Sequence, residues 1–176
     1  MIDYAITLEF DKETENRIQA LIDEVAKVTG CDYIKQAQIP PHVTVSALVS
    51  DNEKALLSEM KSIGETMKKD AVWFANIGVF NPLVIYLGPV MNEFLYNTCK
   101  TVNERLLKYA DVGNRGNYLP YQWVPHAAIA VKLTPDALKA AFAIVQEKFT
   151  AFGATAEKIV LARSVPYEEL CSWRLK

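Results

Sequence analysis

The two histidines of the chain, His42 and His126, occur in matching sequence contexts. Each follows a proline and opens a stretch that is typical of a β-strand, HVTVSALV in one case and HAAIAVKL in the other. Side chains alternate between the two faces of a strand, so His42 shares a face with Thr44, and His126 shares a face with Ala128. If a pseudo-twofold axis relates the two parts of the chain, both imidazoles point into one central groove.

Two imidazoles in one groove can cleave a phosphate ester. The cleavage needs a base that deprotonates the nucleophile and an acid that protonates the leaving oxygen. Histidine, with an unperturbed pKa of about 6.5, can serve as either at neutral pH. Because the two roles need opposite protonation states, we expect a bell-shaped dependence of activity on pH. The Thr44 hydroxyl can hydrogen-bond a phosphate oxygen, and this scheme requires neither a metal nor another cofactor.

Hydrophobic periodicity predicts the elements that position these histidines. Strands are expected at 3–10, 42–49, 72–80, 83–88, 126–133, 154–164 and 169–175, and helices at 13–29, 52–68, 91–109 and 135–149. Asp11, Asp51 and Thr134 are the expected N-caps, and Gly30 is the expected C-cap. Asn81-Pro82 is expected to form the turn of a hairpin, and 110–124 a polar and aromatic loop. The element order of the second half echoes that of the first and suggests a hidden duplication in an α+β protein.

Composition excludes several classes of protein. The chain has 176 residues, of which 51% are hydrophobic and 23% charged, as expected for one globular domain or two tightly joined lobes. A net charge of -2 gives no global support for binding long nucleic acid. Three scattered cysteines predict neither a disulfide framework nor a zinc site. The start of the chain does not resemble a signal peptide, and no apolar stretch is long enough for a membrane span, so we expect a cytoplasmic protein.

The HVTV segment, with the proline before it, resembles the H-x-T/S-x motif of the two-histidine (2H) phosphoesterase superfamily. That superfamily includes 2′-5′ RNA ligase-like proteins and cyclic nucleotide phosphodiesterases, and it carries two such motifs. The final segment, IVLARSVPYEELCSWRL, also resembles the closing hairpin of the family. The resemblance implies a single domain, 1–176, with two pseudo-symmetric lobes of antiparallel sheet and flanking helices around a central groove. The lobes are expected at about 1–88 and 89–176.

One residue departs from the family motif, because Ala128 stands where Thr or Ser is usual. Loss of an oxyanion donor can cost ~100-fold or more in rate. The protein is therefore a weak enzyme, recruits another donor, or only binds its ligand. Candidates by position for a donor or a base-stacking surface are Tyr118, Tyr121 and Trp123, and candidates for phosphate contact are Arg115, Arg163 and Tyr167. The alternative is that the aromatic cluster covers the core and that Arg163 and Tyr167 are structural.

The segment Gly113-Asn114-Arg115-Gly116 matches GxxG, a backbone-clamping loop of some RNA-binding domains. Such four-residue glycine patterns are weak, and the flanking segments here do not fit that fold. We interpret this segment as a flexible loop at the mouth of the groove. The sequence contains no Walker-type loop, no Rossmann glycine motif and no serine nucleophile elbow.

Two functional hypotheses follow. In the first, the protein is a metal-independent phosphoesterase that acts on a 2′,3′-cyclic phosphate or a 2′-5′ phosphodiester of RNA ends or nucleotides. His42 and His126 would be base and acid, in an order that the sequence does not assign. In the second, the protein is a catalytically weak or inactive binding protein that retains the groove, and Ala128 favours this interpretation. In both cases we expect a monomer with a small nucleotide or RNA-end ligand, no membrane partner and no extended nucleic-acid surface.

Overall fold

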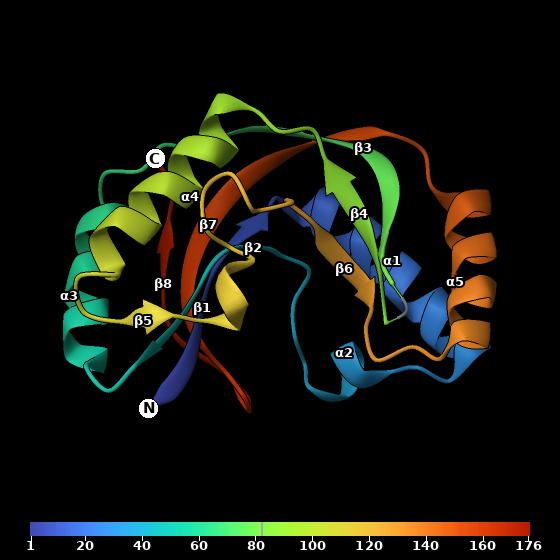
Figure 1. Cartoon of the computed structure of the whole chain (residues 1–176). Helices are drawn as coiled ribbons and strands as arrows, with labels where there is room; N and C mark the ends of the chain where they lie inside the picture. The colour runs from blue at the N-terminus through green and yellow to red at the C-terminus, as the bar shows by residue number, and fades with distance from the viewer. Residues whose placement is uncertain (82) are drawn as a thin grey trace.

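Residues 1–81 and 83–176, which the computed structural model describes, form an eight-stranded antiparallel sheet flanked by helices (Figure 1). The strands are β1 (Ile2–Phe10), β2 (Val43–Ser50), β3 (Asp70–Phe80), β4 (Val84–Pro89), β5 (Asp111–Val112), β6 (Ala127–Ala130), β7 (Phe152–Ser164) and β8 (Tyr167–Arg174). The helices are α1 (Lys12–Thr29), α2 (Tyr33–Gln36), α3 (Glu53–Gly64), α4 (Glu93–Leu106), α5 (Pro135–Lys148) and the 3-10 turn η1 (Asn114–Gly116). The predicted α+β class is confirmed.

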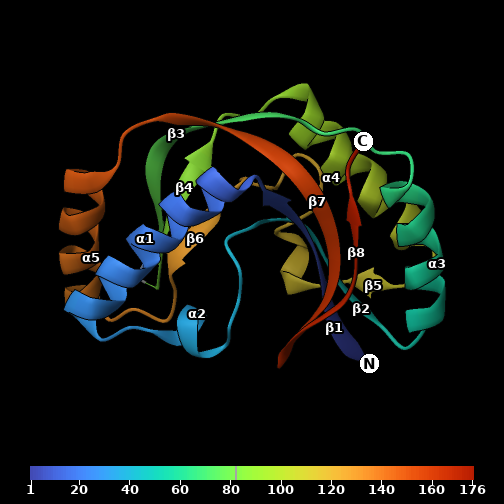
Figure 2. The same cartoon turned by 180° about the vertical axis from the view of Figure 1, so that it is seen from behind.

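The sheet is curved, and its curvature creates the groove. The strand order is β5-β2-β1-β7-β3-β4-β6, with β8 paired to β7 off this path. Although β2 and β6 lie near opposite ends of this order, the two strands contact each other. Both views of the chain show a strongly curved sheet (Figures 1 and 2). The curvature therefore brings together the two strands that follow His42 and His126.

Strand β7 joins the two ends of the arch. Along one edge it pairs with β1, from Tyr4 opposite Arg163 to Phe10 opposite Ala156. Along its other edge it pairs first with β3 and then, beyond Ala156, with β8. One continuous strand of 13 residues thus belongs to both ends of the sheet.

The two lobes are not consecutive halves of the chain. Helix α1 packs against α5 beside β6, and helix α3 packs against α4 and β8. The two helix pairs flank opposite ends of the arch (Figure 2). Each pair joins one helix from the first half of the chain to one from the second half. These helix pairs cross the lobe boundary expected between residues 88 and 89, because each pair combines helices from both halves.

Most of the predicted caps are confirmed. Asp11 accepts a hydrogen bond from the Thr14 amide at 2.9 Å, and Gly30 ends α1 with a φ of 70°. Thr134 accepts from the Ala137 amide at 3.2 Å, at the start of α5. Asp51 does not cap α3: its carboxylate lies 2.8 Å from the amino group of Met1. The cap is the next residue, Asn52, whose side chain accepts from the Ala55 amide.

Several element boundaries differ from those expected. Helices α3 and α4 end at Gly64 and Leu106, earlier than the periodicity indicates. Strand β6 ends at Ala130, and Lys132 just beyond it has a φ of 58°, which an extended strand does not allow. The short elements α2, β5 and η1 were not predicted. The expected turn at Asn81-Pro82 includes Pro82, which lies outside the described residues.

The closing hairpin is confirmed, with Ser164 paired to Tyr167 across a turn at Val165 and Pro166.

No helix in the described part of the chain is both long and apolar enough to cross a membrane.

A close contact at Gly64 sets how α3 packs on β8, and it can be tested. A Cβ at this position would lie 2.5 Å from Trp173 Cβ, so Gly64→Ala should displace the helix from the strand. We expect its free energy of unfolding in urea to fall by about 1–3 kcal/mol. The control is Gly153→Ala, where the new Cβ would lie 3.6 Å from the Trp73 ring, in ordinary contact. Equal stability of the two variants would contradict this account.

Candidate active site

Both histidines are held by the same local hydrogen bond. His42 Nδ1 lies 2.7 Å from the Pro40 carbonyl oxygen, and His126 Nδ1 lies 2.8 Å from the Val124 carbonyl oxygen. A carbonyl oxygen only accepts, so Nδ1 of each ring carries the proton and donates it. The other ring nitrogen, Nε2, is then an acceptor when the ring is neutral and a donor when the ring is protonated. The two rings are therefore oriented in equivalent ways by their own backbone.

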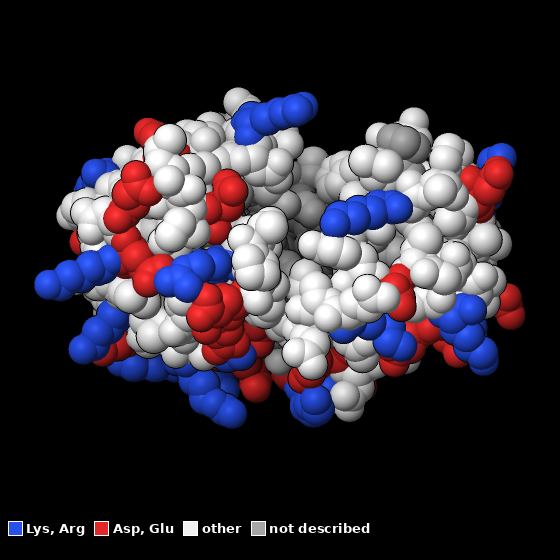
Figure 3. Space-filling model, turned by 90° about the horizontal axis from the view of Figure 1, so that it is seen from below, with Lys and Arg blue, Asp and Glu red and all other residues white. Residues whose placement is uncertain are grey.

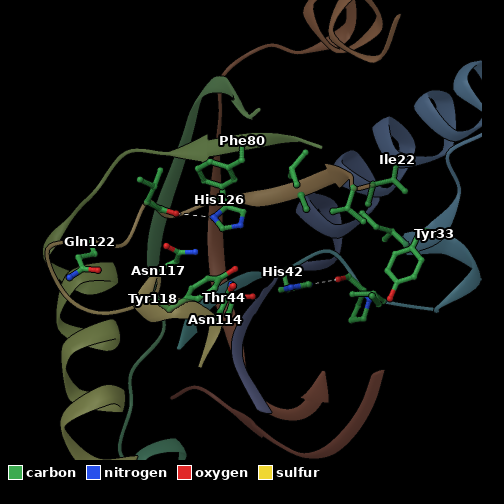
Figure 4. A pocket seen from close by; sticks show the side chains of 17 residues that line it. Ile22, Tyr33, His42, Thr44, Phe80, Asn114, Asn117, Tyr118, Gln122 and His126 are labelled. Atoms are coloured by element: carbon green, nitrogen blue, oxygen red, sulfur yellow. Dashed lines mark hydrogen bonds between the residues drawn. The ribbon is translucent and has the colours of Figure 1, made fainter. Parts of the chain in front are cut away.

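The two imidazoles line one cavity of about 530 Å³ (Figure 4). Thr44 and Ala128, each two residues after its histidine, line the same cavity. The neighbouring residues of Thr44 in β2 are buried on the opposite side, as strand alternation predicts. A second cavity, of about 370 Å³, also contacts His42 and Thr44 and extends to Tyr167. His42 and Thr44 thus lie where the two cavities meet.

Aromatic rings surround His126. The Phe80 ring meets the imidazole edge-on, with centroids 4.8 Å apart, and Tyr86 and Tyr118 have centroids at 5.3 Å and 6.0 Å. The Tyr86 ring lies directly over Gly78, where a Cβ would come within 2.1 Å of its Cζ. Glycine at this position therefore permits Tyr86 to lie against β3 and reach the histidine. These contacts fix the position of His126 from the β3–β4 side of the cavity.

Burial favours the neutral form of both histidines. Desolvation lowers the pKa of His42 and of His126, and the carbonyl bound to each Nδ1 partly opposes this effect. A positive charge on His42 lowers the pKa of His126 further. Protonation of one ring therefore disfavours protonation of the other, so the pair takes up a first proton more readily than a second. A pair with one proton is the combination that paired acid and base catalysis needs.

Tyr118 places a hydroxyl beside the first motif. Burial raises the pKa of Tyr118, while hydrogen bonding with the Thr44 and Asn114 side chains partly lowers it. Figure 4 shows Tyr118 and Thr44 close together, below His126 in this view, and both residues line the cavity. The phenol stays protonated at neutral pH, because its pKa lies above the ordinary value near 10. Of the three aromatic candidates in this loop, Tyr118 is the one that lines the cavity.

The other two aromatic candidates lie elsewhere. Trp123 is buried with 6% of its surface exposed, and its Nε1 has no hydrogen-bond partner in the described part of the chain. It belongs to the core and cannot stack on a base. Tyr121 is 92% exposed and contacts the Tyr96 ring, outside the cavity. The residue between them, Gln122, does line the cavity and was not predicted.

The two arginine candidates do not line either cavity. Arg163 is held by carboxylates: its Nε and Nη2 donate to Glu53 at 3.0 Å and 2.7 Å, and Nη1 donates to Glu168. These ion pairs occupy the guanidinium, so the structure gives no support to the expected phosphate contact by Arg163. Arg115 is exposed in η1 with a φ of 55°. Tyr167 lines the second cavity, and burial raises its pKa to about 12.

The loop before β6 contributes residues that the sequence did not single out. Asn114 and Asn117 line the cavity, and Gly113 fixes the loop by donating its amide to the Ala47 carbonyl at 3.0 Å. A Cβ at Gly113 would lie 2.8 Å from the Leu48 amide nitrogen, so only glycine fits this approach to β2. The GNRG segment thus reaches the groove through Asn114, as expected of a loop at its mouth, whereas the expected flexibility of this loop stays a prediction.

Asn103 of α4 holds the same loop from behind. Its buried carboxamide donates to the Tyr118 carbonyl at 3.1 Å and to the Cys99 carbonyl at 2.8 Å, and it accepts from Ser46 at 2.9 Å. The side chain therefore ties α4 to β2 and to the backbone of Tyr118. No local sequence signal identifies this role, because it depends on contacts between residues distant in the chain.

The residues around the cavity carry few charges. Uncharged residues form most of the border of the central hollow in Figure 3, although basic side chains lie at its rim. Within 1–81 and 83–176, no group of three or more His, Cys, Asp or Glu side chains is placed to hold a metal ion. The side-chain polar groups along the cavity are two imidazoles, the Thr44, Tyr118 and Tyr33 hydroxyls, and the amides of Asn114, Asn117 and Gln122.

The electrostatic coupling of the histidines can be measured without a substrate. In His42→Ala, the pKa of His126 should rise, because a neighbouring positive charge is lost and water gains access. NMR titration of the imidazole resonances of wild type and variant would measure this change. Asn97→Ala, an exposed substitution on α4, should leave the pKa of His126 unchanged. A pKa of His126 that is unchanged or lower in His42→Ala would show that the rings are not coupled.

Comparison with known proteins agrees with this geometry. A family model described as the 2′-5′ RNA ligase superfamily matches residues 10–167. No curated protein matches the chain. A crystal structure described as a phosphoesterase is 14% identical, with a TM-score of 0.66, and the match covers 99% of this chain and 98% of that one.

Two named structures are similar over the same extent, 99% of this chain and 98% of theirs. E. coli LigT complexed with 3′-AMP is 11% identical with a TM-score of 0.61, and TT0787 of Thermus thermophilus is 15% identical with a TM-score of 0.62. At these identities the likeness establishes the fold. Together with the family match, it confirms the predicted relationship: the chain belongs to the 2′-5′ RNA ligase superfamily of two-histidine phosphoesterases.

Proposed function

We propose that this protein is a metal-independent phosphoesterase that cleaves a 2′,3′-cyclic phosphate or a 2′-5′ phosphodiester on a nucleotide or RNA end. The observation that carries the proposal is the equivalent anchoring of two imidazoles through Nδ1 at one cavity. The structure of LigT with 3′-AMP supports a nucleotide ligand, because a related protein of this fold holds one. The superfamily supports the class of reaction.

The reaction uses the histidines in opposite protonation states. The neutral imidazole accepts a proton from water at Nε2 as the water oxygen bonds to phosphorus. The protonated imidazole donates its Nε2 proton to the leaving oxygen as the other phosphorus–oxygen bond breaks. One proton enters and one leaves the pair, so the net charge of the site is conserved. Because the pKa of each ring is lowered, the singly protonated pair forms on the acid side of neutrality.

Tyr118 compensates for the hydroxyl that Ala128 lacks. The phenol lies beside both Thr44 and His126, on the same cavity, and it remains a hydrogen-bond donor at neutral pH. Thr44 and Tyr118 can then contact two phosphate oxygens held between the imidazoles. Donors placed in this way stabilise the charge that develops in the transition state. The second motif therefore keeps its imidazole, while a loop residue supplies the hydroxyl.

A binding protein without turnover is the second candidate function. The observation that favours it is Ala128, since the usual position for the second hydroxyl offers only a methyl group. Such a protein would hold a phosphate ester through the same groups but would not release a cleaved product. The experiments on the histidines and on Tyr118 separate the two functions.

The histidines should be required for turnover. With chelator present, wild type should hydrolyse at least one 2′,3′-cyclic nucleotide, with a bell-shaped dependence of kcat/KM on pH. His42→Ala and His126→Ala should each lower kcat by about 10²–10⁴-fold, because each removes one proton-transfer step. Urea unfolding would test whether the variants are folded. Phosphate-ester binding without any hydrolysis would favour the binding protein, and activity that returns only with added metal would exclude the mechanism.

Tyr118→Phe tests the replacement hydroxyl. The change keeps the ring and removes the donor, so kcat/KM should fall by about 100-fold with little change in stability. Tyr96→Phe is the matched control, because Tyr96 contacts the exposed Tyr121 and does not line the cavity. Ala128→Thr in the Tyr118→Phe background should recover part of the loss. If Tyr118→Phe retains full activity, another group supplies the donor.

A further inference from the structure

The main cavity has two chemically different ends. Near His126 the loop before β6 contributes the amides of Asn114, Asn117 and Gln122. Other elements contribute a hydrocarbon part of the lining, which we call the apolar end; its residues are Ile22, Tyr33, Ile34, Ile39, Val84 and Val131. Figure 4 shows Ile22 and Tyr33 on the side of His42 away from Asn117 and Gln122. A phosphate between the imidazoles therefore has unlike surroundings on its two sides.

The apolar end is a built part of the fold. Ile22 of α1 and Ile34 of α2 are 2% and 8% exposed and belong to the hydrophobic core. Of the side chains that line this end in the described residues, Tyr33 alone carries a polar group. Lys132, which does not line the cavity, has its Nζ 3.5 Å from the Tyr33 ring centroid. The Pro40 carbonyl nearby is already occupied by His42 Nδ1. A ligand group here would meet almost only hydrocarbon.

The charge of the cleft suits one phosphate. Within the described residues, no Lys or Arg lines the main or the second cavity, and the single charged residue that does is Asp3, in the second cavity. Proteins that hold several nucleic-acid phosphates place Lys or Arg against them. A single negative charge, in contrast, can be held by an imidazolium and hydroxyl donors. The cleft is therefore poorly matched to a chain of nucleotides.

Desolvation decides what the apolar end accepts. A nucleobase edge placed there would lose its hydrogen bonds to water without gaining partners, and each unpaired group weakens binding about tenfold or more. A hydrocarbon or aromatic group has no hydrogen bonds to water to lose when it enters this end. Each methylene that leaves water strengthens binding by about fourfold. The difference favours an apolar group over a base at this end.

We propose that the preferred substrate is a small, singly charged phosphodiester with an apolar alkyl or aromatic alcohol group, which occupies the apolar end. The inference rests on the proposed function for the position of the phosphate between His42 and His126. It narrows the substrates of that site, because it favours a compact ester with an apolar substituent over an RNA end with further phosphates.

A series of methyl alkyl phosphodiesters, from ethyl to hexyl, tests the inference through binding alone. Wild-type affinity, measured by calorimetry, should rise by about fourfold per methylene until the apolar end is filled. Val84→Thr and Val131→Thr keep the side-chain shape and add a hydroxyl to the apolar end. In both variants, the increase in affinity per methylene should therefore be smaller than in wild type. Val28→Thr, on an exposed position of α1, is the matched control and should keep the wild-type dependence.

Two results distinguish this inference from the proposed function. Affinity that rises with chain length, without hydrolysis of any ester or cyclic nucleotide, would support the apolar end and overturn the phosphoesterase function. Hydrolysis of 2′,3′-cyclic nucleotides, with affinity for the esters independent of chain length, would support the function and overturn the inference. Tighter binding of an RNA dinucleotide with an added terminal phosphate than of the hexyl ester would also overturn it.

Discussion

The site depends on one long strand that holds a curved sheet together. β7 pairs with β1 on one edge and with β3 and then β8 on the other, so it belongs to both ends of the arch. This pairing lets β2 and β6, near opposite ends of the strand order, contact each other. The two histidines precede these strands and therefore meet across the cavity. Without the curvature, the same two motifs would lie at distant edges of a flat sheet.

Hydrogen bonds to the local backbone orient the two imidazole rings, and the loop before β6 gives the two rings different surroundings. The carbonyls of Pro40 and Val124 fix the same tautomer in both imidazoles. Around His126, however, three aromatic rings and the loop amides create a polar and aromatic setting, whereas hydrocarbon lies beyond His42. Two imidazoles held in equivalent ways are thus placed in an asymmetric cavity. Under the proposed function, the pair of imidazoles would carry out the reaction, and the surfaces on either side of it would select the ligand.

Sequence reasoning located the histidines and Thr44 because their signal is local. A proline, a histidine and an alternating strand occupy consecutive residues, and strand geometry then gives the shared face. Arg163 forms an ion pair with Glu53, which lies 110 residues away in sequence. Local sequence patterns cannot predict such a long-range pair. Tyr121 is exposed and Trp123 buried in a loop where Tyr121 has a φ of 69°, and hydrophobicity does not reveal such a backbone conformation. Helix exchange between the halves was missed for the same reason, because periodicity carries no information about partners.

The central position of β7 also governs the order in which the molecule can form. In the described residues, the strip β5-β2-β1 and the strip β3-β4-β6 are joined in the sheet through β7. On the ribosome, both strips emerge before residues 152–164, so β1 and β3 each present an unpaired edge while synthesis continues. Open edges of this kind can pair with other chains, and contacts so distant in sequence form slowly. His42, Thr44, Tyr118 and His126 are therefore all synthesised before the strand that joins the two strips of the sheet.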